Sequence, residues 1–485
     1  MQNDRLINYS LVLNIISRNL LIMAVSLLVC AVVAIVYSES ISPFTISSLV
    51  LFLISVPILR KTKNVVNNTT VNRREAYLTV TLSWFIIGLS GAIPYLISGA
   101  IPSFVDAVFE SISGFTTTGS SILADIESLP KSILFWRSMT HWIGGIGIIV
   151  LVIVIMPSLQ IGSYHLFSME SSLQEKIQAR IKSVGHRLLI IYVVLTVAEI
   201  VLLMLGHMNF YESTCHAFGT VATGGFSPKN TSIAGYSPYI QYVIMLFMVL
   251  AGTNFAVHYY VFKRKYQKIK GNEEVRFYLL VLLVLGLIIS GILFVKMNLP
   301  LEQAFRDGFF QVISIVTCTG FATADYMVWP RYAWFILFLA MFLGGSTGST
   351  AGGIKMVRHM ILLKNIRRTF RLMVWPNAVI PVKLDHSAVS DESNSNIISF
   401  IMAYFMIFVA GTIIMILLGV NLNEATSSVA TCMAGIGPGL GKVGPAGNFA
   451  HLSESAKLLL SFLMIVGRLE IYTVLIIFTR NFWKS

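Results

Sequence analysis

The fold of this chain is decided by the stretch Val316-Thr317-Cys318-Thr319-Gly320-Phe321, because related stretches occur three more times. The other three are Phe115-Thr116-Thr117-Thr118-Gly119-Ser120, Thr220-Val221-Ala222-Thr223-Gly224-Gly225 and Thr431-Cys432-Met433-Ala434-Gly435-Ile436. Their key glycines, Gly119, Gly224, Gly320 and Gly435, recur roughly every hundred residues, which indicates an internal repeat. Each copy follows a short segment with an acidic residue near its start, and it lies between two long apolar runs. The pattern predicts a unit of membrane helix, short half-helix, glycine turn and returning membrane helix, repeated four times.

Composition places the chain in a membrane. Of its 485 residues, 55% are hydrophobic and only 12% are charged, whereas about 25% of a typical soluble protein is charged. Many apolar runs reach the ~20 residues that a membrane helix needs. The basic residues behind the net charge of +13 lie between these runs. They therefore indicate a topology signal and contacts with lipid headgroups rather than nucleic-acid binding. The four cysteines form no CxxC pair, and we expect neither a zinc nor a redox site, nor a cofactor in this chain.

The apolar runs predict ten membrane spans and four half-helices. The spans cover residues 11–36 and 41–58 ahead of the repeats, then 77–97, 133–156, 188–205, 240–262, 277–295, a broken one starting at 332, 397–420 and 456–478. The half-helices cover 104–115, 210–219, 301–315 and 423–431. We expect an all-α polytopic membrane protein in which four pseudosymmetric helix–pore-helix–helix repeats surround one central pore, plus two extra N-terminal transmembrane helices.

The predicted regions follow from these boundaries. They are 1–75 (extra helices and a basic loop), 76–160 (repeat one), 161–187 (a linker with an interfacial helix), 188–272 (repeat two), 273–372 (repeat three), 373–395 (a cytoplasmic linker) and 396–485 (repeat four).

Basic residues give the orientation. Lysine and arginine gather in 60–74, 176–187, 263–270 and 355–371, and they are few beside the glycine turns. The positive-inside rule therefore predicts that both termini are cytoplasmic and that all four turns lie near the outer face. Repeats that share one orientation can be arranged around a fourfold axis, unlike the inverted repeats of many transporters.

The repeated turns have the chemistry of a cation filter. Backbone carbonyls lining a narrow tube can replace the water shell of a cation, and glycine puts no side chain into such a tube. Half-helices ending there also present the partly negative ends of their dipoles. Glycines in membrane segments often serve helix packing instead, but four in register favour a filter. The candidate ion-binding residues are Thr116, Thr117, Thr118, Gly119, Val221, Ala222, Thr223, Gly224, Thr317, Cys318, Thr319, Gly320, Cys432, Met433, Ala434 and Gly435.

These turns, together with Gly344-Gly345-Ser346-Thr347-Gly348-Ser349-Thr350-Ala351-Gly352-Gly353-Ile354-Lys355, resemble the Trk/Ktr/HKT superfamily of potassium transporters. The two extra N-terminal spans are similar to the bacterial TrkH type rather than the shorter KtrB type. The resemblance implies potassium permeation, a homodimer in the bacterial inner membrane, and a cytosolic TrkA-like ring that binds NADH, ATP or ADP. A glycine in all four turns matches the potassium-permeable pattern, since sodium-selective plant relatives carry serine in the first. The fourth turn departs from the pattern because Met433-Ala434-Gly435 lacks the threonine.

The stretch Gly344 to Gly353 interrupts an apolar segment and has three interpretations. It lacks the glycine-lysine-serine/threonine order of a phosphate loop, since Ile354 separates Gly353 from Lys355 and Met356 follows. It is then either a flexible kink or a polar loop that crosses the permeation path below the filter. The resemblance implies the second, gate-like role.

Arg468 lies in the last predicted span, where a buried charge is costly and is a functional candidate by default. The alternative is a structural ion pair, although Glu470 is not an obvious partner within the helix. In similar proteins an arginine in this helix lies in the pore beneath the filter, so we expect Arg468 to act in gating.

Two functions remain open at this point. The first is a gated, channel-like potassium uptake subunit, and the second is a secondary transporter that couples potassium to sodium or protons. A membrane enzyme is not indicated, because no nucleophile–base pair or metal-ligand cluster stands out in the sequence.

Overall fold

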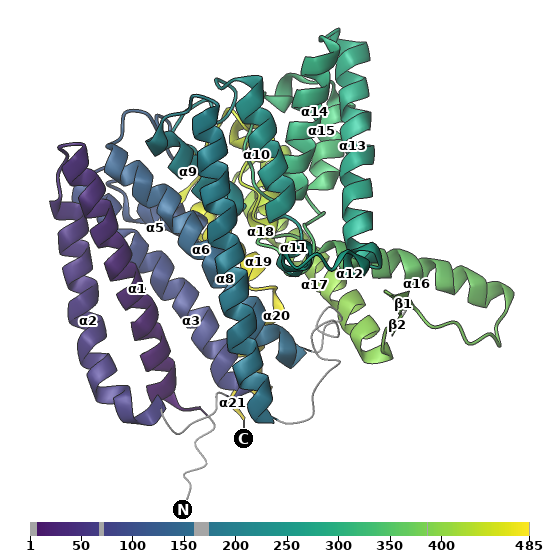
Figure 1. The fold of residues 1–485 in the computed structure, drawn as a ribbon, viewed down its shortest axis with the longest axis horizontal. Coiled ribbons are helices and arrows are strands. Elements are labelled where there is room, and N and C mark those ends of the chain that lie inside the picture. The colour runs from purple at the N-terminus through teal and green to yellow at the C-terminus, as the bar shows by residue number, and fades with distance from the viewer. Residues whose placement is uncertain (1–6, 67–71, 160–173, 386, 485) are drawn as a thin grey trace, which may run out of the picture.

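The computed structural model describes residues 7–66, 72–159, 174–385 and 387–484. Almost all regular structure in these ranges is helical, and the prediction of an all-helical, multi-span membrane protein is confirmed (Figure 1). Within these described ranges, six helices are long and apolar enough to cross a membrane, and two bent helix pairs also pass as broken spans or re-entrant segments. The described residues contain one small addition, an antiparallel pair of β1 (Lys383–Leu384) and β2 (Ser387–Ala388), within the predicted linker 373–395.

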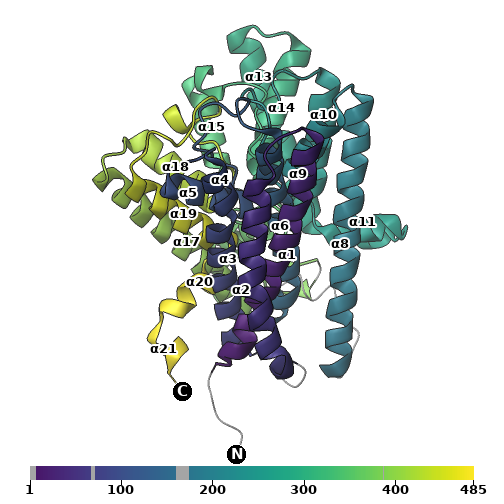
Figure 2. The same cartoon turned by 90° about the vertical axis from the view of Figure 1, so that its left-hand side faces the viewer.

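An N-terminal helical hairpin forms one side of the molecule. It consists of α1 (Tyr9–Val36) and α2 (Ser42–Val66), which lie side by side in both views (Figures 1 and 2). Apolar side chains such as Val32 and Leu53 are exposed on it, as expected of a lipid-facing surface. Glu39, in the turn of the hairpin, accepts hydrogen bonds from the backbone N–H groups of Lys131 and Ser132 at 2.7 and 2.8 Å. The hairpin is therefore joined to the repeats although it has no glycine turn of its own.

The helices of the four repeats follow in chain order. Repeat one contains α3 (Arg73–Gly91), α4 (Ile93–Ser98), α5 (Phe104–Phe115) and α6 (Lys131–Leu159). Repeat two contains α8 (Gln174–Leu205), α9 (Phe210–Val221), α10 (Pro238–Ala251), α11 (Phe255–Phe262) and α12 (Tyr266–Lys270). Repeat three contains α13 (Glu273–Met297), α14 (Leu301–Val316), η2 (Tyr326–Val328), α15 (Arg331–Ala340) and α16 (Met356–Val374). Repeat four contains α17 (Asp391–Leu417), α18 (Leu422–Ala434), η3 (Gly441–Val443), α19 (Glu454–Arg468), α20 (Tyr472–Leu475), η4 (Ile476–Phe478) and α21 (Arg480–Trp483).

The half-helices α5, α9, α14 and α18 coincide closely with the four predicted segments. Each has an acidic residue in its first turn, namely Asp106, Glu212, Glu302 and Glu424, which complements the positive end of the helix dipole. Asn209 caps α9 by accepting a hydrogen bond from the backbone N–H of Glu212 at 2.8 Å. In repeat one, Asp106 pairs with Lys457 of α19 at 2.6 Å, so the last repeat lies against the first.

Two spans predicted as continuous are broken, and that part of the prediction was wrong. The segment 240–262 bends by 101° between α10 and α11, and the segment 456–478 bends by 108° between α19 and α20. At the first break, the side chain of Asn254 starts α11 by accepting a hydrogen bond from Ala256 N at 2.8 Å. At the second, Glu470 and Ile471 have φ of 57° and 54°, which a helix cannot continue through.

Helix α8 covers the second half of the predicted linker 161–187. Residues 160–173 lie outside the described residues, and from Gln174 onward the chain is already part of α8. The expected interfacial helix therefore coincides, over residues 174–187, with the first part of α8, whose apolar span begins at Gly185. The C-terminal α21 lies at the same end of the molecule as the start of α3, where Arg74 donates a hydrogen bond to the carbonyl of Lys484 at 2.7 Å.

Candidate ion-conducting site

All four half-helices end in the same backbone turn. An N–H group just beyond each helix donates to the carbonyl five residues earlier, which closes the turn as in a Schellman motif. These bonds are Thr118 N to Ser113 O, Gly224 N to Gly219 O, Thr319 N to Ser314 O and Ile436 N to Thr431 O, at 2.8 to 3.0 Å. Each turn also contains two left-handed residues separated by one other residue. The pairs are Thr117 and Gly119, Thr223 and Gly225, Cys318 and Gly320, and Gly435 and Gly437, with φ between 53° and 105°.

This shared geometry changes the register expected from the sequence. The residues equivalent to Gly119 and Gly320 are Gly225 and Gly437, not Gly224 and Gly435. The mistake arose because turn two contains two consecutive glycines, and turn four contains Gly435 and Gly437 on either side of Ile436. We refer below to Gly119, Gly225, Gly320 and Gly437 as the ring glycines, and to turns one to four in chain order.

The ring glycines close a circle of contacts. A Cβ atom on Gly119 would clash with the carbonyl oxygen of Gly224 in turn two. In the same way, one on Gly225 would meet Thr319 O, one on Gly320 would meet Ile436 O, and one on Gly437 would meet Thr118 O. Each turn thus abuts the next, and the fourth abuts the first, so the four turns form a ring around one axis. Glycine is required here both by the left-handed backbone and by the close approach of a neighbouring carbonyl.

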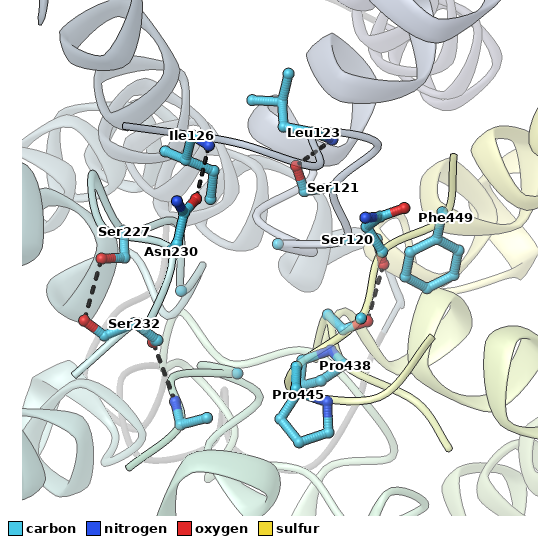
Figure 3. A pocket seen from close by; sticks show the side chains of 18 of the residues that line it. Ser120, Ser121, Leu123, Ile126, Ser227, Asn230, Ser232, Pro438, Pro445 and Phe449 are labelled. Atoms are coloured by element: carbon cyan, nitrogen blue, oxygen red, sulfur yellow. Dashed lines mark hydrogen bonds between the residues drawn. The ribbon is translucent and has the colours of Figure 1, made fainter. Parts of the chain in front are cut away.

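A cavity of about 190 Å³ lies over the ring, and all four ring glycines line it. Figure 3 shows this pocket between segments of all four repeats, with repeat one at the top, repeat two at the left, repeat three below and repeat four at the right. Hydrogen bonds fasten its rim, including Ile126 N to Asn230 Oδ1 at 2.7 Å and Ser120 Oγ to Gly437 O at 3.0 Å. Asn230 also bonds Asp125, which holds the pKa of that exposed carboxyl below its ordinary value. The cavity is a vestibule that leads to the ring.

The threonines of turns one and three are arranged alike. The hydroxyls of Thr116 and Thr118 lie 2.8 Å apart, and those of Thr317 and Thr319 are also 2.8 Å apart. Turn four has Ala434 and Ile436 at these positions, so this hydroxyl pair is missing there. The backbone of turn four nevertheless follows that of the other turns, so its carbonyls are placed alike without threonine.

A buried ion pair supports the first half-helix, and sequence reasoning missed it. Glu110 of α5 and Arg137 of α6 are 0% and 3% exposed, and their charged groups are 2.6 Å apart. Glu110 also accepts a hydrogen bond from Ile122 N at 2.9 Å, just beyond turn one. The signal was present, because Arg137 is a charged residue inside a predicted span.

The polar loop 344–353 lies directly against the ring. Thr350 Oγ1 donates to Val221 O of turn two at 3.0 Å, and Ser346 N donates to Gly252 O at the α10–α11 break at 2.9 Å. A Cβ on Gly352 would clash with Ala434 O of turn four, and one on Gly353 would lie 3.4 Å from Cys318 Sγ of turn three. The loop therefore contacts three of the four turns.

Arg468 is the last residue of α19 rather than the middle of a continuous span. It is 6% exposed, and its Nη1 donates to the carbonyl of Thr350 in the loop at 2.8 Å. Within the described residues no carboxylate lies within ion-pair distance of Arg468, since Glu470 pairs with Arg358 at 2.5 Å. Counting from the first residues of α6, α10, α15 and α19, Arg468 occupies the position of Gly145, Gly252 and Gly345 in the other repeats. A charge stands where the three other repeats have glycine.

Comparison with known proteins identifies the family. The model of the TrkH family, described as cation transport protein, matches residues 42–485. The chain belongs to the TrkH family. Its relatives include the Trk system potassium uptake protein TrkH of Escherichia coli K12, 36% identical over 85% of this chain and 86% of that protein. Another is TrkH of Vibrio parahaemolyticus, 32% identical over 98% and 99%.

A solved structure agrees with the TrkH assignment. The crystal structure of the potassium transporter TrkH from Vibrio parahaemolyticus superposes with a TM-score of 0.90 at 31% identity, and it covers 98% of this chain and 100% of that one. The matched region includes all four turns, the loop 344–353 and Arg468. The resemblance expected from the sequence is therefore confirmed, and the chain is a multi-pass membrane transport protein rather than an enzyme.

Proposed function

We propose that this chain is the membrane subunit of a Trk-type system that takes up potassium, and rubidium as its close analogue, through a gated central pore. The observation that carries the proposal is the closed ring in which each turn abuts the carbonyl of the next. Relatives at about 35% identity are named Trk system potassium uptake proteins, which supports potassium as the ion. The chain brings no cofactor of its own to this task, because dehydration and passage of a cation need only fixed oxygen ligands.

The filter consists of the four turns. Their backbone carbonyls replace the hydration shell of potassium, and the C-terminal ends of α5, α9, α14 and α18 favour a positive ion at the axis. In the register described above, the carbonyls nearest to the ring glycines belong to Thr118, Gly224, Thr319 and Ile436. These four oxygens form one coordination layer.

The gate lies on the other side of the ring from the vestibule. The loop 344–353 obstructs the path, and Arg468, bonded to Thr350, adds a positive charge that raises the barrier for a cation. The glycines of the loop, of which Gly348 and Gly353 have φ of 77° and 67°, allow its backbone to rearrange. Opening moves the loop away from the ring.

The partners follow the Trk pattern. The chain works as a homodimer in the bacterial inner membrane, with both termini in the cytoplasm and the vestibule facing outward. A cytosolic TrkA-like ring that binds NADH, ATP or ADP acts on the basic cytoplasmic segments and controls the gate. The chain itself has no phosphate loop, so nucleotide binding belongs to the TrkA-like partner.

Purified protein in proteoliposomes tests the proposal. We expect inward rubidium flux that potassium competes for and sodium competes for weakly. Gly119→Ser should lower the ratio of potassium to sodium permeability, because the new side chain would displace the carbonyl of Gly224. Absence of potassium or rubidium flux under every applied ion gradient, in folded dimeric protein, would overturn the proposal.

A second function uses the same pore. If transport couples potassium to sodium or protons, flux depends on a gradient of that second ion and saturates as a carrier does. Recordings in planar bilayers separate the two, since ohmic single-channel currents in potassium alone support the channel and exclude obligatory coupling.

A further inference from the structure

The imidazole of His141 packs directly against turn two. His141 belongs to α6 and is fully buried, and its ring is stacked on Phe226 with the ring centroids 4.1 Å apart. A Cβ placed on Gly224 would lie 2.5 to 2.7 Å from three atoms of the imidazole. The imidazole therefore packs against the Cα of Gly224, the residue whose carbonyl faces Gly119 in the filter.

This contact explains why residue 224 is glycine, although the backbone conformation there does not require one. Gly225 has a φ of 77° and must be glycine, but Gly224 is not among the left-handed residues, so its backbone is open to any amino acid. The equivalent residues of the other turns are Thr118, Thr319 and Ile436, all of which carry branched side chains. In turn two the space of that side chain is taken by the imidazole of His141.

The other three repeats have methionine at the position that corresponds to His141. Ten residues after the starts of α6, α10, α15 and α19 stand His141, Met248, Met341 and Met464, all fully or almost fully buried. Helix α6 packs on turn two at Gly145 and Ala222, and the next helix, α10, packs on turn three through Gly252 and Thr317. In this register, His141 of α6 corresponds to Met248 of α10, and Gly224 of turn two corresponds to Thr319 of turn three. An imidazole in α6 thus goes with a glycine in turn two, whereas a flexible methionine in α10 goes with a threonine in turn three.

His141 also supplies a fixed bond that methionine cannot. Its Nδ1 lies 2.7 Å from the carbonyl oxygen of Gly114 in α5, so the imidazole joins half-helix one to turn two. One turn earlier on α6, the guanidinium of Arg137 lies 3.5 Å from the centroid of the same Phe226 ring and bonds Ser227 O at 3.0 Å. Arg137 is held by Glu110, so the stack of Arg137, Phe226 and His141 is anchored at both ends.

We propose that His141 is a positioning residue that sets the carbonyl of Gly224 and thereby contributes to cation selectivity, and that His141 and Gly224 are a co-adapted pair. The inference rests on the proposed function, because it assigns a role within that filter. Cation selectivity needs oxygens held at defined positions. A stacked, hydrogen-bonded ring holds its neighbour more firmly than an unbranched methionine, which adapts its shape.

An exchange of the pair tests the proposal. Gly224→Thr alone should abolish rubidium flux, since the new side chain has no room beside the imidazole of His141. His141→Met alone should preserve flux but lower the potassium-to-sodium permeability ratio by roughly two- to tenfold, the range expected for one lost buried hydrogen bond. The double variant, His141→Met with Gly224→Thr, reproduces the combination of the next repeat and should restore flux lost in Gly224→Thr. Reversal potentials under bi-ionic conditions and rubidium flux give the two readouts.

Controls separate the possible failures. His186→Met, at an exposed position of α8, should leave both readouts unchanged. If Gly119→Ser alters selectivity but His141→Met does not, the positioning role is wrong while the filter stands. If the double variant transports no better than Gly224→Thr, with all variants dimeric and thermally stable, the co-adapted pair is wrong. If Gly119→Ser also has no effect, the filter assignment itself fails.

Discussion

At the scale of single residues, the ring depends on two left-handed positions that have different demands. The first is occupied by Thr117, Thr223, Cys318 and Gly435, so three of the four turns place a side chain there. A left-handed conformation costs a non-glycine residue roughly 1–2 kcal/mol, and such strain persists where the surrounding structure fixes it. The second position is glycine in every turn, because a neighbouring carbonyl occupies the space of the side chain.

This difference gives a prediction for turn four. Gly435→Thr should be tolerated, since threonine occupies the equivalent position in turns one and two and the only atom near a Cβ there is Thr117 O at 4.0 Å. Gly437→Ala should reduce potassium flux at least tenfold, because the added carbon meets Thr118 O in a left-handed backbone with φ of 105°. Rubidium uptake by the two variants measures this. The opposite ranking would restore the register expected from the sequence.

At the scale of elements, α19 in repeat four shows how the loop 344–353 is attached to the rest of the chain. Helix α19 ends at Arg468, and Glu470 in the break after it pairs with Arg358 of α16. Arg358 also lies 3.7 Å from the centroid of the Phe400 ring in α17. Because α16 continues directly from the loop 344–353, this ion pair connects the loop to the break in α19. The loop and the break in α19 are therefore held together through α16.

The ion pair has a measurable contribution to stability. Removing one partner of a buried pair typically costs ~3–5 kcal/mol, because the other charge is left without compensation. Arg358 is 2% exposed, so Glu470→Gln should lower the thermal unfolding temperature clearly. The double replacement Arg358→Met with Glu470→Leu should be less harmful than Glu470→Gln, since it leaves no uncompensated charge. Equal stability of Glu470→Gln and the original protein would show that the pair is not important to the fold.

The gate itself gives the second prediction at this scale. Arg468→Ala removes a positive charge and the hydrogen bond to Thr350 O, and deletion of residues 346–350 removes the obstruction. Both variants should raise basal rubidium flux in the absence of any regulator, the deletion more than the substitution. Lys442→Ala, which changes an exposed charge near the vestibule, is the control. Unchanged flux in both gate variants, with folding and dimerisation intact, would make Arg468 a structural residue.

At the scale of the whole molecule, the sequence predicted the order of elements well and their breaks poorly. Apolar run length and the four glycine turns were enough to find α5, α9, α14 and α18, because a run too short to cross a membrane has few alternatives. The breaks before α11 and α20 were missed because the apolar helices on either side keep the averaged hydropathy high, despite Asn254 at the first break and Glu470 at the second. The pairing of Glu110 with Arg137 and of His141 with Gly224 depends on contacts between helices, which no local pattern contains.

The regulator's docking site is predicted from the way in which basic segments gather on one part of the surface. Lys364 of α16 bonds Glu273, the first residue of α13, and also donates to Lys383 O of β1 at 2.7 Å. Glu273 N in turn donates to Asp385 Oδ1 at 2.8 Å. These bonds join the N-terminal end of α13, α16 and the β1–β2 pair. Helix α12 lies beside them, and the exposed basic residues 263–265 directly precede it (Figure 1). A soluble partner bound here could pull on α16 and hence on the gate loop.

Replacing Lys263, Arg264 and Lys265 together by glutamine should therefore weaken binding of a purified TrkA-like ring. Each exposed ionic contact is worth ~0.2–1 kcal/mol, so losing three should raise the Kd by roughly three- to one hundredfold. The affinity of the original protein should fall as salt is added, and that of the triple variant should fall less, because fewer exposed ionic contacts remain to be screened. Light scattering or biolayer interferometry in detergent gives the affinities, with Lys442→Gln on the vestibule side as the control.

Without the TrkA-like partner, the chain should show no saturable ATP binding at high salt, since the nucleotide site belongs to that partner. An unchanged Kd in the triple variant would place the docking surface elsewhere, and saturable ATP binding by the chain alone would contradict a separate regulator.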